Sequence, residues 1–333
     1  MVEALDADGR TGWGEGHISP GYSQETVDGG WGFCREQAAR LIGRNVTEAK
    51  AELESSIAAS PVASTALITA LEMLEGSALL RVETDAKIPL LTPLHGADAA
   101  GIADEVERRL DEGFRTFKVK VGRDADADLA RVRVVQEAIA GRATIRLDAN
   151  RGFSRADGCR FAAALDPAGI ELFEQPCASD DWAANAAVAK VSTVPVMLDE
   201  SIYGMADIER AAPLSGVGLI KLKLKKTGSV ERLRMGLLRI RELGMEPVLG
   251  DGVAADIGCW MEACVARDTI RNAGELNGFL KAKARLFRMP LRFERGALHL
   301  PAGFVPEIDR AALEAHRLAV ERFAAPRIVT PAV

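Results

Sequence analysis

Short apolar runs alternate with amphipathic stretches over the middle of the chain. The stretches at 126–140 and 230–243 repeat apolar residues at helical spacing, and the runs between such stretches have the length of buried strands. Strands are predicted at 90–94, 117–121, 144–149, 172–175, 196–199, 219–224 and 247–250, with a weaker eighth at 269–272. Seven or eight strand–helix units within roughly 190 residues favour a closed α/β barrel of parallel strands over an open sheet.

The two ends of the chain follow other patterns. The first residues indicate two short strands joined by a turn at 6–9, and a hairpin turning at 295–296 is predicted over 291–300. A two-stranded ribbon is only marginally stable alone. We therefore expect either that further strands of this module are missing or that the neighbouring domain covers its edge. Further helices are predicted at 35–56, 62–76 and 308–323.

These patterns divide the chain into three parts. We expect an α+β capping domain over 1–87, apparently without its first strands, and a barrel domain over 88–290. The C-terminal segment, 291–333, is expected to leave the barrel and pack back on the capping domain.

Composition narrows the function classes. A hydrophobic share of 48% with 27% charged residues is that of a globular, soluble protein, and a net charge of -6 argues against a nucleic-acid partner. The sequence has no apolar run near the roughly 20 residues of a membrane helix. Five scattered cysteines without a CxxC pair indicate reduced thiols and a cytoplasmic location. A small-molecule partner is therefore expected, and a homo-oligomer is compatible with the sequence.

Three acidic residues stand where apolar runs end. Asp148, Glu174 and Asp199 lie 26 and then 25 residues apart, which is about one strand–helix unit each time. The repeat would bring the three carboxylates to neighbouring strand ends. An isolated acid there is commonly a helix cap, but three at even spacing predict a divalent metal site at the mouth of the barrel.

Two predicted strands carry lysines where a helix-covered barrel strand should be almost wholly apolar. Lys118 and Lys120 share one face of the second strand, and Lys221, Lys223 and Lys225 share one face of the sixth. Because Lys221, Lys223 and Lys225 share one face, alternation along the strand cannot tell which of them enters the site. Lys223 follows Asp199 by 24 residues, however, and so continues the interval between the carboxylates. Lys225 or Lys226, nearer the loop, is expected to face solvent or a substrate anion.

The order of these motifs resembles the enolase superfamily, in its mandelate racemase/muconate lactonizing enzyme (MLE) subgroup. The motifs are Lys-x-Lys at 118–120, Asp-x-Asn at 148–150, Glu-Gln-Pro at 174–176, Asp-Glu-Ser at 199–201 and Lys-x-x-Lys-x-Gly at 223–228. The resemblance covers nearly the whole chain and implies a (β/α)7β TIM-like barrel with a capping domain.

The resemblance also implies roles for individual residues. Mg²⁺, or Mn²⁺ in its place, would bind the three carboxylates, and two lysines would act as acid and base on opposite sides of the substrate with a third assisting. These residues are Asp148, Glu174 and Asp199 for the metal, and Lys120, Lys223 and the assisting Lys118 for the chemistry. Asn150, Glu200 and Asp251 are expected beside the metal ligands or the substrate.

These residues suit abstraction of a proton next to a substrate carboxylate. A metal on that carboxylate stabilises the enediolate that forms, and burial or a neighbouring cation can lower a lysine pKa enough for it to act as the base. Enolase-superfamily sites with a lysine base and Mg²⁺ are themselves a standard example of this chemistry.

Racemisation or epimerisation of an amino-acid derivative is the leading prediction, because one lysine can remove the proton and the other return it. Syn-dehydration or cycloisomerisation with one base, and a non-catalytic barrel that retains the metal site, are the alternatives. The Asp-x-Asp with which dipeptide epimerases bind an α-ammonium group is replaced here by the segment 274–278, which argues against a dipeptide substrate.

Overall fold

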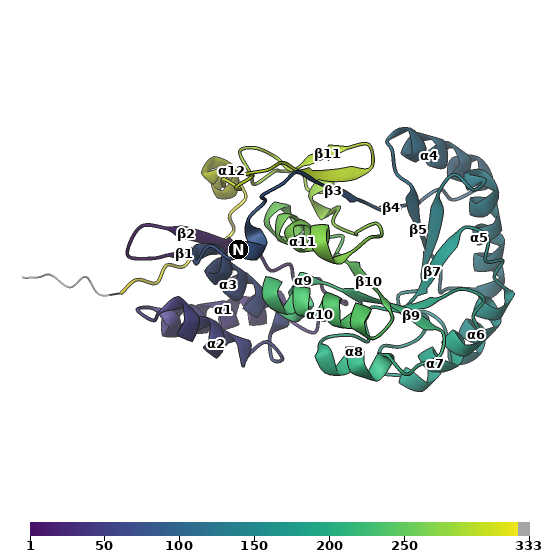
Figure 1. Cartoon of the computed structure of the whole chain (residues 1–333), viewed down its shortest axis with the longest axis horizontal. Helices are drawn as coiled ribbons and strands as arrows, with labels where there is room; N and C mark the ends of the chain where they lie inside the picture. The colour runs from purple at the N-terminus through teal and green to yellow at the C-terminus, as the bar shows by residue number, and fades with distance from the viewer. Residues whose placement is uncertain (326–333) are drawn as a thin grey trace, which may run out of the picture.

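A curled sheet of parallel strands forms the centre of the molecule (Figure 1). The computed structural model describes residues 1–325. Within these residues each strand of the sheet pairs in parallel with the next along the chain, as expected when a crossover segment follows every strand. The strands are β4 (Thr92–Pro93), β5 (Thr116–Lys120), β6 (Thr144–Asp148), β7 (Ile170–Glu174), β8 (Val196–Leu198), β9 (Val217–Leu222) and β10 (Glu246–Leu249).

Helices cross over between these strands and cover the outside of the sheet, as Figure 1 shows for the arc from α4 to α7. Several begin at a side chain that accepts a backbone N–H of the first turn, among them Asp98, Asp124, Ser154, Asp181 and Ser229. The helices are α4 (Ala99–Asp111), α5 (Ala125–Ile139), α6 (Arg155–Ala164), α7 (Trp182–Val191), α8 (Met205–Ala211), α9 (Leu224–Thr227), α10 (Val230–Glu242) and α11 (Asp256–Thr269).

Alternation along the strands separates an apolar floor from charged residues nearer the carboxyl ends. A buried cluster contains Leu172, Met197, Leu219 and Val248, one from each of four adjacent strands. Because side chains repeat their direction every second residue, the residues two positions later continue the same face. On three of these strands they are Glu174, Asp199 and Lys221.

The prediction of an eighth strand at 269–272 is wrong. Helix α11 runs to Thr269, whose hydroxyl donates to the carbonyl of Val265 within the helix. The pairing comes later: Gly274 N donates to Pro89 O at 2.8 Å, and Glu275 N donates to Leu249 O at 3.0 Å. This segment therefore hydrogen-bonds on one side to β10, an edge strand of the curled sheet, and on the other to the residues that lead from β3 into β4. It has no apolar run that would have identified it in the sequence.

The N-terminal segments form a hairpin packed on helices. Strands β1 (Val2–Leu5) and β2 (Thr11–Gly14) pair antiparallel, and β2 packs on α3 (Pro61–Leu74). The predicted helix at 35–56 is instead two helices, α1 (Val27–Leu41) and α2 (Val46–Glu54). Gly43 takes a φ of +78° and Asn45 caps α2, so the chain turns between them.

The C-terminal hairpin β11 (Arg292–Glu294) and β12 (Ala297–Leu300) forms a three-stranded sheet with β3 (Ala86–Pro89). A helix lies within the predicted range 308–323, but it is much shorter than predicted: α12 covers only Arg310–Ala315. Beyond it Leu318 is fully exposed, so it gains no burial that would extend the helix. Two 3₁₀ turns, Ala78–Leu80 and Gly278–Leu280, complete the elements of the described residues.

Two carboxylates, the half-buried Glu15 and the buried Glu72, join the N-terminal segments to the helices around the sheet. Glu15 accepts the backbone N–H groups of Ala255 and Gly258 at the start of α11, at 2.5 and 3.1 Å. Glu72 of α3 accepts those of Val230 and Glu231 at the start of α10, at 3.0 and 3.3 Å. Both place a carboxyl group at the positive end of a helix.

The helices of residues 1–325 include none that is both long enough and apolar enough to cross a membrane.

Candidate active site

A cavity of about 1050 Å³ lies between the carboxyl ends of the parallel strands and the N-terminal segments. The strand ends contribute most of the lysines and acids singled out in the sequence to its lining. Its roof comes from 19–33 and 54–62, including Tyr22, Phe33 and Ile57. Strand ends and N-terminal segments thus enclose one site.

The three predicted metal-binding carboxylates lie side by side. Asp148 ends β6 and Glu174 ends β7, where the two residues are register partners, and Asp199 directly follows β8. All three are buried, with at most 2% of each side chain exposed. Asp148 and Asp199 line the cavity, and Glu174 lies between them in strand order without lining it.

Two buried lysines lie among these carboxylates. Lys118 Nζ is 2.8 Å from Asp148 Oδ2 and 3.0 Å from Glu174 Oε2. Lys221 Nζ is 3.1 Å from Glu174 Oε1 on the other side. Both ammonium groups also contact Glu275, which for Lys118 is a distance of 2.9 Å.

The two lysines predicted as acid and base approach from different strands. Lys120, at the end of β5, places Nζ 2.6 Å from Asp148 Oδ2 and also contacts Asn150. Lys223, just after β9, places Nζ 2.7 Å from Asp199 Oδ2. Three strands separate β5 from β9 in the sheet, so the two ammonium groups flank the carboxylates. Their exposure differs: 55% for the Lys120 side chain and 13% for that of Lys223.

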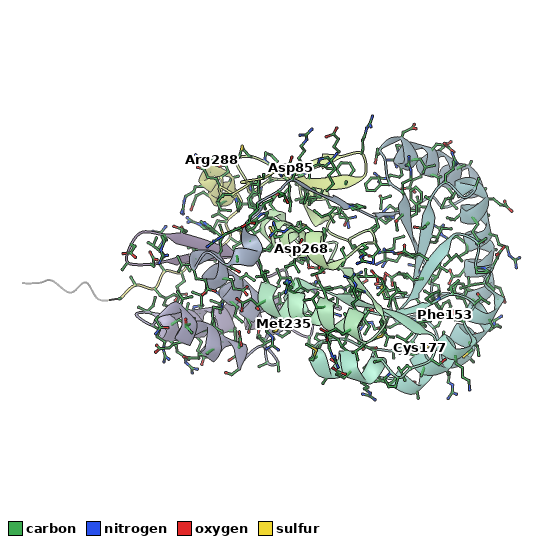
Figure 2. The ribbon with its side chains drawn as sticks, in the orientation of Figure 1. Asp85, Phe153, Cys177, Met235, Asp268 and Arg288 are labelled. Atoms are coloured by element: carbon green, nitrogen blue, oxygen red, sulfur yellow. The ribbon has the colours of Figure 1, made fainter. Side chains whose placement is uncertain are left out.

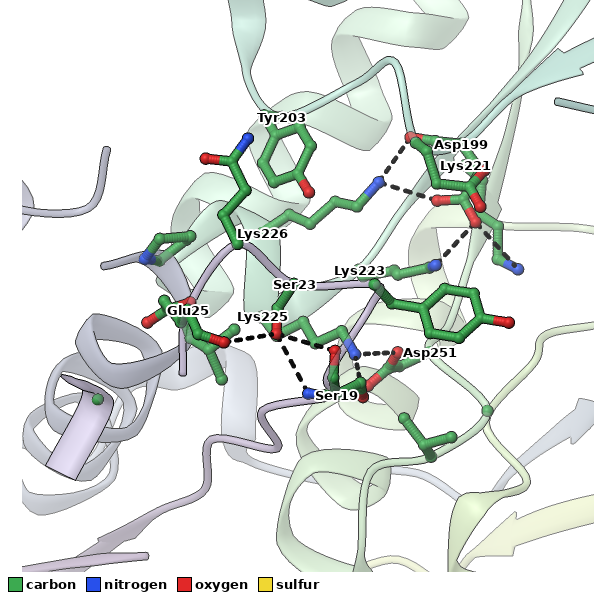
Figure 3. A pocket seen from close by; sticks show the side chains of 18 of the residues that line it. Ser19, Ser23, Glu25, Asp199, Tyr203, Lys221, Lys223, Lys225, Lys226 and Asp251 are labelled. Carbon is green, nitrogen blue, oxygen red and sulfur yellow. Dashed lines mark hydrogen bonds and ion pairs between the residues drawn. The ribbon is translucent and has the colours of Figure 1, made fainter. Parts of the chain in front are cut away.

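Lys225 and Lys226 line the cavity and do not face open solvent, with side chains 13% and 6% exposed. Figure 3 shows Lys226 directed at Asp199, where Nζ is 2.9 Å from Oδ1, and the side chain is 6% exposed. Lys225 instead pairs with Asp251 at 2.8 Å and donates to Ser19 Oγ at 3.4 Å. Asp251 therefore belongs to the cavity wall, tied to a lysine and through it to the N-terminal segment.

Asn150 and Glu200 connect neighbouring strand ends. Asn150 Nδ2 donates to Glu200 Oε1 at 3.2 Å, and its backbone N–H donates to Asp148 Oδ1 at 2.9 Å. Gln175, which the sequence singled out only as part of a motif, accepts the N–H groups of Asp199 and Ser201 through Oε1, at 3.0 and 3.1 Å. It therefore fixes the loop that carries Asp199.

Glu275 is the main acidic residue of the site that was not among the predicted site residues. It follows Asp251 by 24 residues, and Asp251 follows Lys223 by 28, so it continues the series of strand-end positions. That interval was the available signal. The strand predicted at 269–272 ends before Glu275, whereas the observed pairing occurs at Gly274 and Glu275.

Charges within the cluster shift several pKa values. Burial opposes ionisation of Asp199, but the ammonium groups of Lys223 and Lys226 outweigh it and hold its pKa well below the usual range. Burial likewise opposes ionisation of Asp148, and Lys118 and Lys120 reverse the effect and lower its pKa. Glu174 differs, because burial and the adjacent Asp148 raise its pKa to about 7 despite two neighbouring lysines.

The donor chemistry of the carboxylates suits a hard divalent cation. All their donor atoms are oxygens, and the buried Glu200 Oε2 beside Asp199 lacks a hydrogen-bond partner within the described part of the chain. Ammonium groups lie between the carboxylates, and across residues 1–325 no three His, Cys, Asp or Glu side chains gather around one point. The residue types therefore fit a divalent metal, while their present partners are lysines.

Cys177 plays no part in this site. It is buried near Phe153 on the side of the sheet covered by α6 and α7, as Figure 2 shows, and it does not line the cavity. Burial raises the pKa of its thiol to about 11.

Comparison with known proteins agrees with this arrangement. Residues 101–309 match the family model of the enolase C-terminal domain-like proteins (MR/MLE). The hydrophobic dipeptide epimerase of Citrifermentans bemidjiense is 30% identical over 286 residues, which cover 80% of this chain and 75% of the relative. Muconate cycloisomerase 1 of Rhodococcus opacus is 28% identical over 91% of this chain and 86% of its own.

A solved structure of a relative has the same fold as this chain. The crystal structure of muconate cycloisomerase from Pseudomonas fluorescens superposes with a TM-score of 0.86 at 26% identity, and covers 94% of this chain and 92% of its own. An o-succinylbenzoate synthase of Geobacillus kaustophilus, 30% identical over 80% of this chain and 71% of its own, adds a third named activity. The chain therefore belongs to the enolase C-terminal domain-like (MR/MLE) family, whose members similar to it include epimerases, cycloisomerases and synthases.

Proposed function

We propose that this protein abstracts a proton next to the carboxylate of a small-molecule substrate, on a (β/α)7β barrel with a divalent metal. Asp148, Glu174 and Asp199 would hold the metal, with Mg²⁺ as the expected ion. Racemisation or epimerisation of an amino-acid derivative is the reaction we favour. The epimerases among the relatives support that choice.

The chemistry divides between the metal and the lysines. When bound, Mg²⁺ would supply positive charge that stabilises the negative charge developing on the substrate carboxylate. Lys120 and Lys223 enter the cavity from β5 and β9, on either side of the carboxylates. One would remove the α-proton and the other would deliver a proton to the opposite face.

The observation that carries the proposal is the pairing of these two lysines with two different carboxylates in one cavity. Lys120 contacts Asp148 and Lys223 contacts Asp199, at 2.6 and 2.7 Å. Each ammonium group is held by a carboxylate that a metal would also bind. Metal binding would therefore weaken both contacts and leave the lysines available to a substrate.

Exchange of the α-proton with solvent tests the shared step whatever the final product. N-acyl amino acids and hydroxy acids would be incubated with Mg²⁺ in D₂O and followed by NMR. Replacement of either lysine, as Lys120→Ala or Lys223→Ala, should lower exchange on its own face of the substrate at least about 100-fold. Lys190→Met, an exposed lysine at the end of α7, should leave it unchanged.

Unaltered exchange in both lysine variants, or no exchange of any carboxylate by the wild-type protein, would contradict the proposal. It would then favour a barrel that binds a ligand without catalysis.

A second candidate uses only one lysine as the base, giving cycloisomerisation or syn-dehydration. The difference in exposure favours it, because Lys223 is largely buried whereas Lys120 is open to solvent. Relatives named muconate cycloisomerase and o-succinylbenzoate synthase add support. In this reaction the α-proton of the substrate would exchange with solvent through one lysine only, and no product of inverted configuration would appear.

A further inference from the structure

Lys221 is a buried cation for which the proposed proton abstraction has no use. It lies two residues before Lys223 on the same face of β9, and its side chain is 2% exposed. Its Nζ is 3.1 Å from Glu174 Oε1 and 3.9 Å from Asp199 Oδ2, and it contacts Glu275. One ammonium group thus lies beside two of the three carboxylates assigned to the metal.

The cluster already contains more cations than anions without a metal. Its four carboxylates are Asp148, Glu174, Asp199 and Glu275, and the five ammonium groups that contact them belong to Lys118, Lys120, Lys221, Lys223 and Lys226. A divalent cation that binds the carboxylates must compete with these ammonium groups.

Lys221, like Lys118, has little freedom to withdraw, because the two side chains are 2% and 4% exposed. Lys120 is 55% exposed and can turn toward solvent. Leu219 lies two residues before Lys221 on the same face of β9, and Val248 of β10 is the register partner of Lys221; both belong to the buried apolar cluster. The ammonium group of Lys221 therefore stays near Glu174 when a metal approaches, and repulsion between close charges in a buried site is large.

We propose that Lys221 is an internal counter-ion that competes with the divalent metal and lowers its affinity for the site. Glu275 is its partner: it holds the ammonium group and offsets part of its charge. The inference rests on the proposed metal site of Asp148, Glu174 and Asp199. It assigns Lys221 to the control of metal affinity and not to proton transfer.

Binding of Mn²⁺ to the full chain, followed by titration calorimetry and by the electron paramagnetic resonance signal of free Mn²⁺, tests this assignment without any substrate. Lys221→Met should bind Mn²⁺ at least about tenfold more tightly than the wild type, because a repelling charge is removed. Glu275 keeps Lys118 as a partner in that variant. Glu275→Gln should bind Mn²⁺ more weakly, because it removes a negative charge and leaves Lys221 in place.

The opposite directions separate this role from a structural one, which would weaken binding in both variants. Lys281→Met is the matched control. Lys281 lines the same cavity, donates to Gly252 O at 2.7 Å and forms no ion pair with another described residue. Its removal should change the affinity less than about threefold, since its ammonium group pairs with none of the four carboxylates of the cluster.

Mn²⁺ affinity of Lys221→Met equal to or below that of the wild type overturns the inference and leaves the proposed proton abstraction standing. Failure of the wild type and all variants to bind Mn²⁺ overturns both. Thermal unfolding and circular dichroism check that each variant folds. Should the Met variant not fold, Lys221→Gln, which is also neutral, provides the same comparison.

Discussion

At the scale of single residues, the site depends on side chains that fix a loop as much as on those that carry charge. Gln175 takes a φ of +38° and is fully buried. Its amide oxygen accepts two backbone N–H groups of the Asp199 loop, and its Nε2 donates to Ser201 Oγ at 2.8 Å. Loss of this amide would leave several buried polar groups without partners.

Gln175→Leu is therefore expected to lower the free energy of unfolding by about 2–4 kcal/mol, because each buried group left unsatisfied costs about 1–3 kcal/mol. Urea denaturation measures the change. Val191→Ala, at an exposed position at the end of α7, is a control and should change stability by less than about 1 kcal/mol. A Gln175→Leu protein as stable as the wild type would show that the loop does not depend on this amide.

Spacing along the sequence identified part of the site but not all of it. The intervals between Asp148, Glu174, Asp199 and Lys223 follow the strand–helix repeat, so these residues could be placed together before the structure was known. Lys221 could not be distinguished from Lys223 and Lys225, because alternation along a strand shows which face a side chain is on but not how deeply it is buried on that face. Glu275 was missed because the segment that carries it has no apolar run.

At the scale of elements, β2 and α3 are in unusually close contact. A Cβ on Gly12 would lie 2.0 Å from Ala70 O, and a Cβ on Gly14 would lie 2.0 Å from Ala66 O. The strand thus approaches the helix backbone directly. Helices and strands whose apolar residues repeat at a clear period were predicted near their observed positions. No such repeat marks the contact between β2 and α3, and only the two glycines indicate it.

Gly14→Ala is expected to destabilise the protein by roughly 2–4 kcal/mol, because the added methyl group meets backbone atoms that cannot move aside. Gly32→Ala is the matched control. It lies inside α1, where a Cβ meets nothing within 4 Å, and it should stabilise by about 0.5–1 kcal/mol through helix propensity. Thermal unfolding of the two variants should shift in opposite directions, and a shared direction would contradict the packing argument.

At the scale of the whole molecule, the N-terminal segments and the helices around the sheet meet through the carboxyl groups of Glu15 and Glu72. Glu72 of α3 is fully buried against the start of α10, and burial raises its pKa to about 7 although two backbone N–H groups and Lys50 favour its charged form. Folding therefore has to accommodate a group that releases its proton less readily than in the unfolded chain.

The stability that Glu72 contributes should be fully present below about pH 4.5 and lost as the pH rises to about 7, because the folded protein binds the proton more tightly. The free energy of unfolding of the wild type relative to Glu72→Gln should then fall by on the order of 2–3 kcal/mol over this range. Urea denaturation at pH 5, 6, 7 and 8 measures it. A difference that is constant or grows with pH contradicts the prediction.

The placement of charged residues at the strand ends has an evolutionary consequence. Successive strand–helix units each carry a charged residue at or just after the end of a strand, from Lys120 through Asp148, Glu174, Asp199 and Lys223 to Asp251, and Glu275 follows the bridge at Gly274. A substitution at one of these positions changes one charge, whereas the hydrogen-bonded sheet beneath it is built from backbone and apolar residues. New chemistry can therefore arise by single replacements on an unchanged scaffold, and the roof contributed by the N-terminal segments can vary independently to admit new substrates.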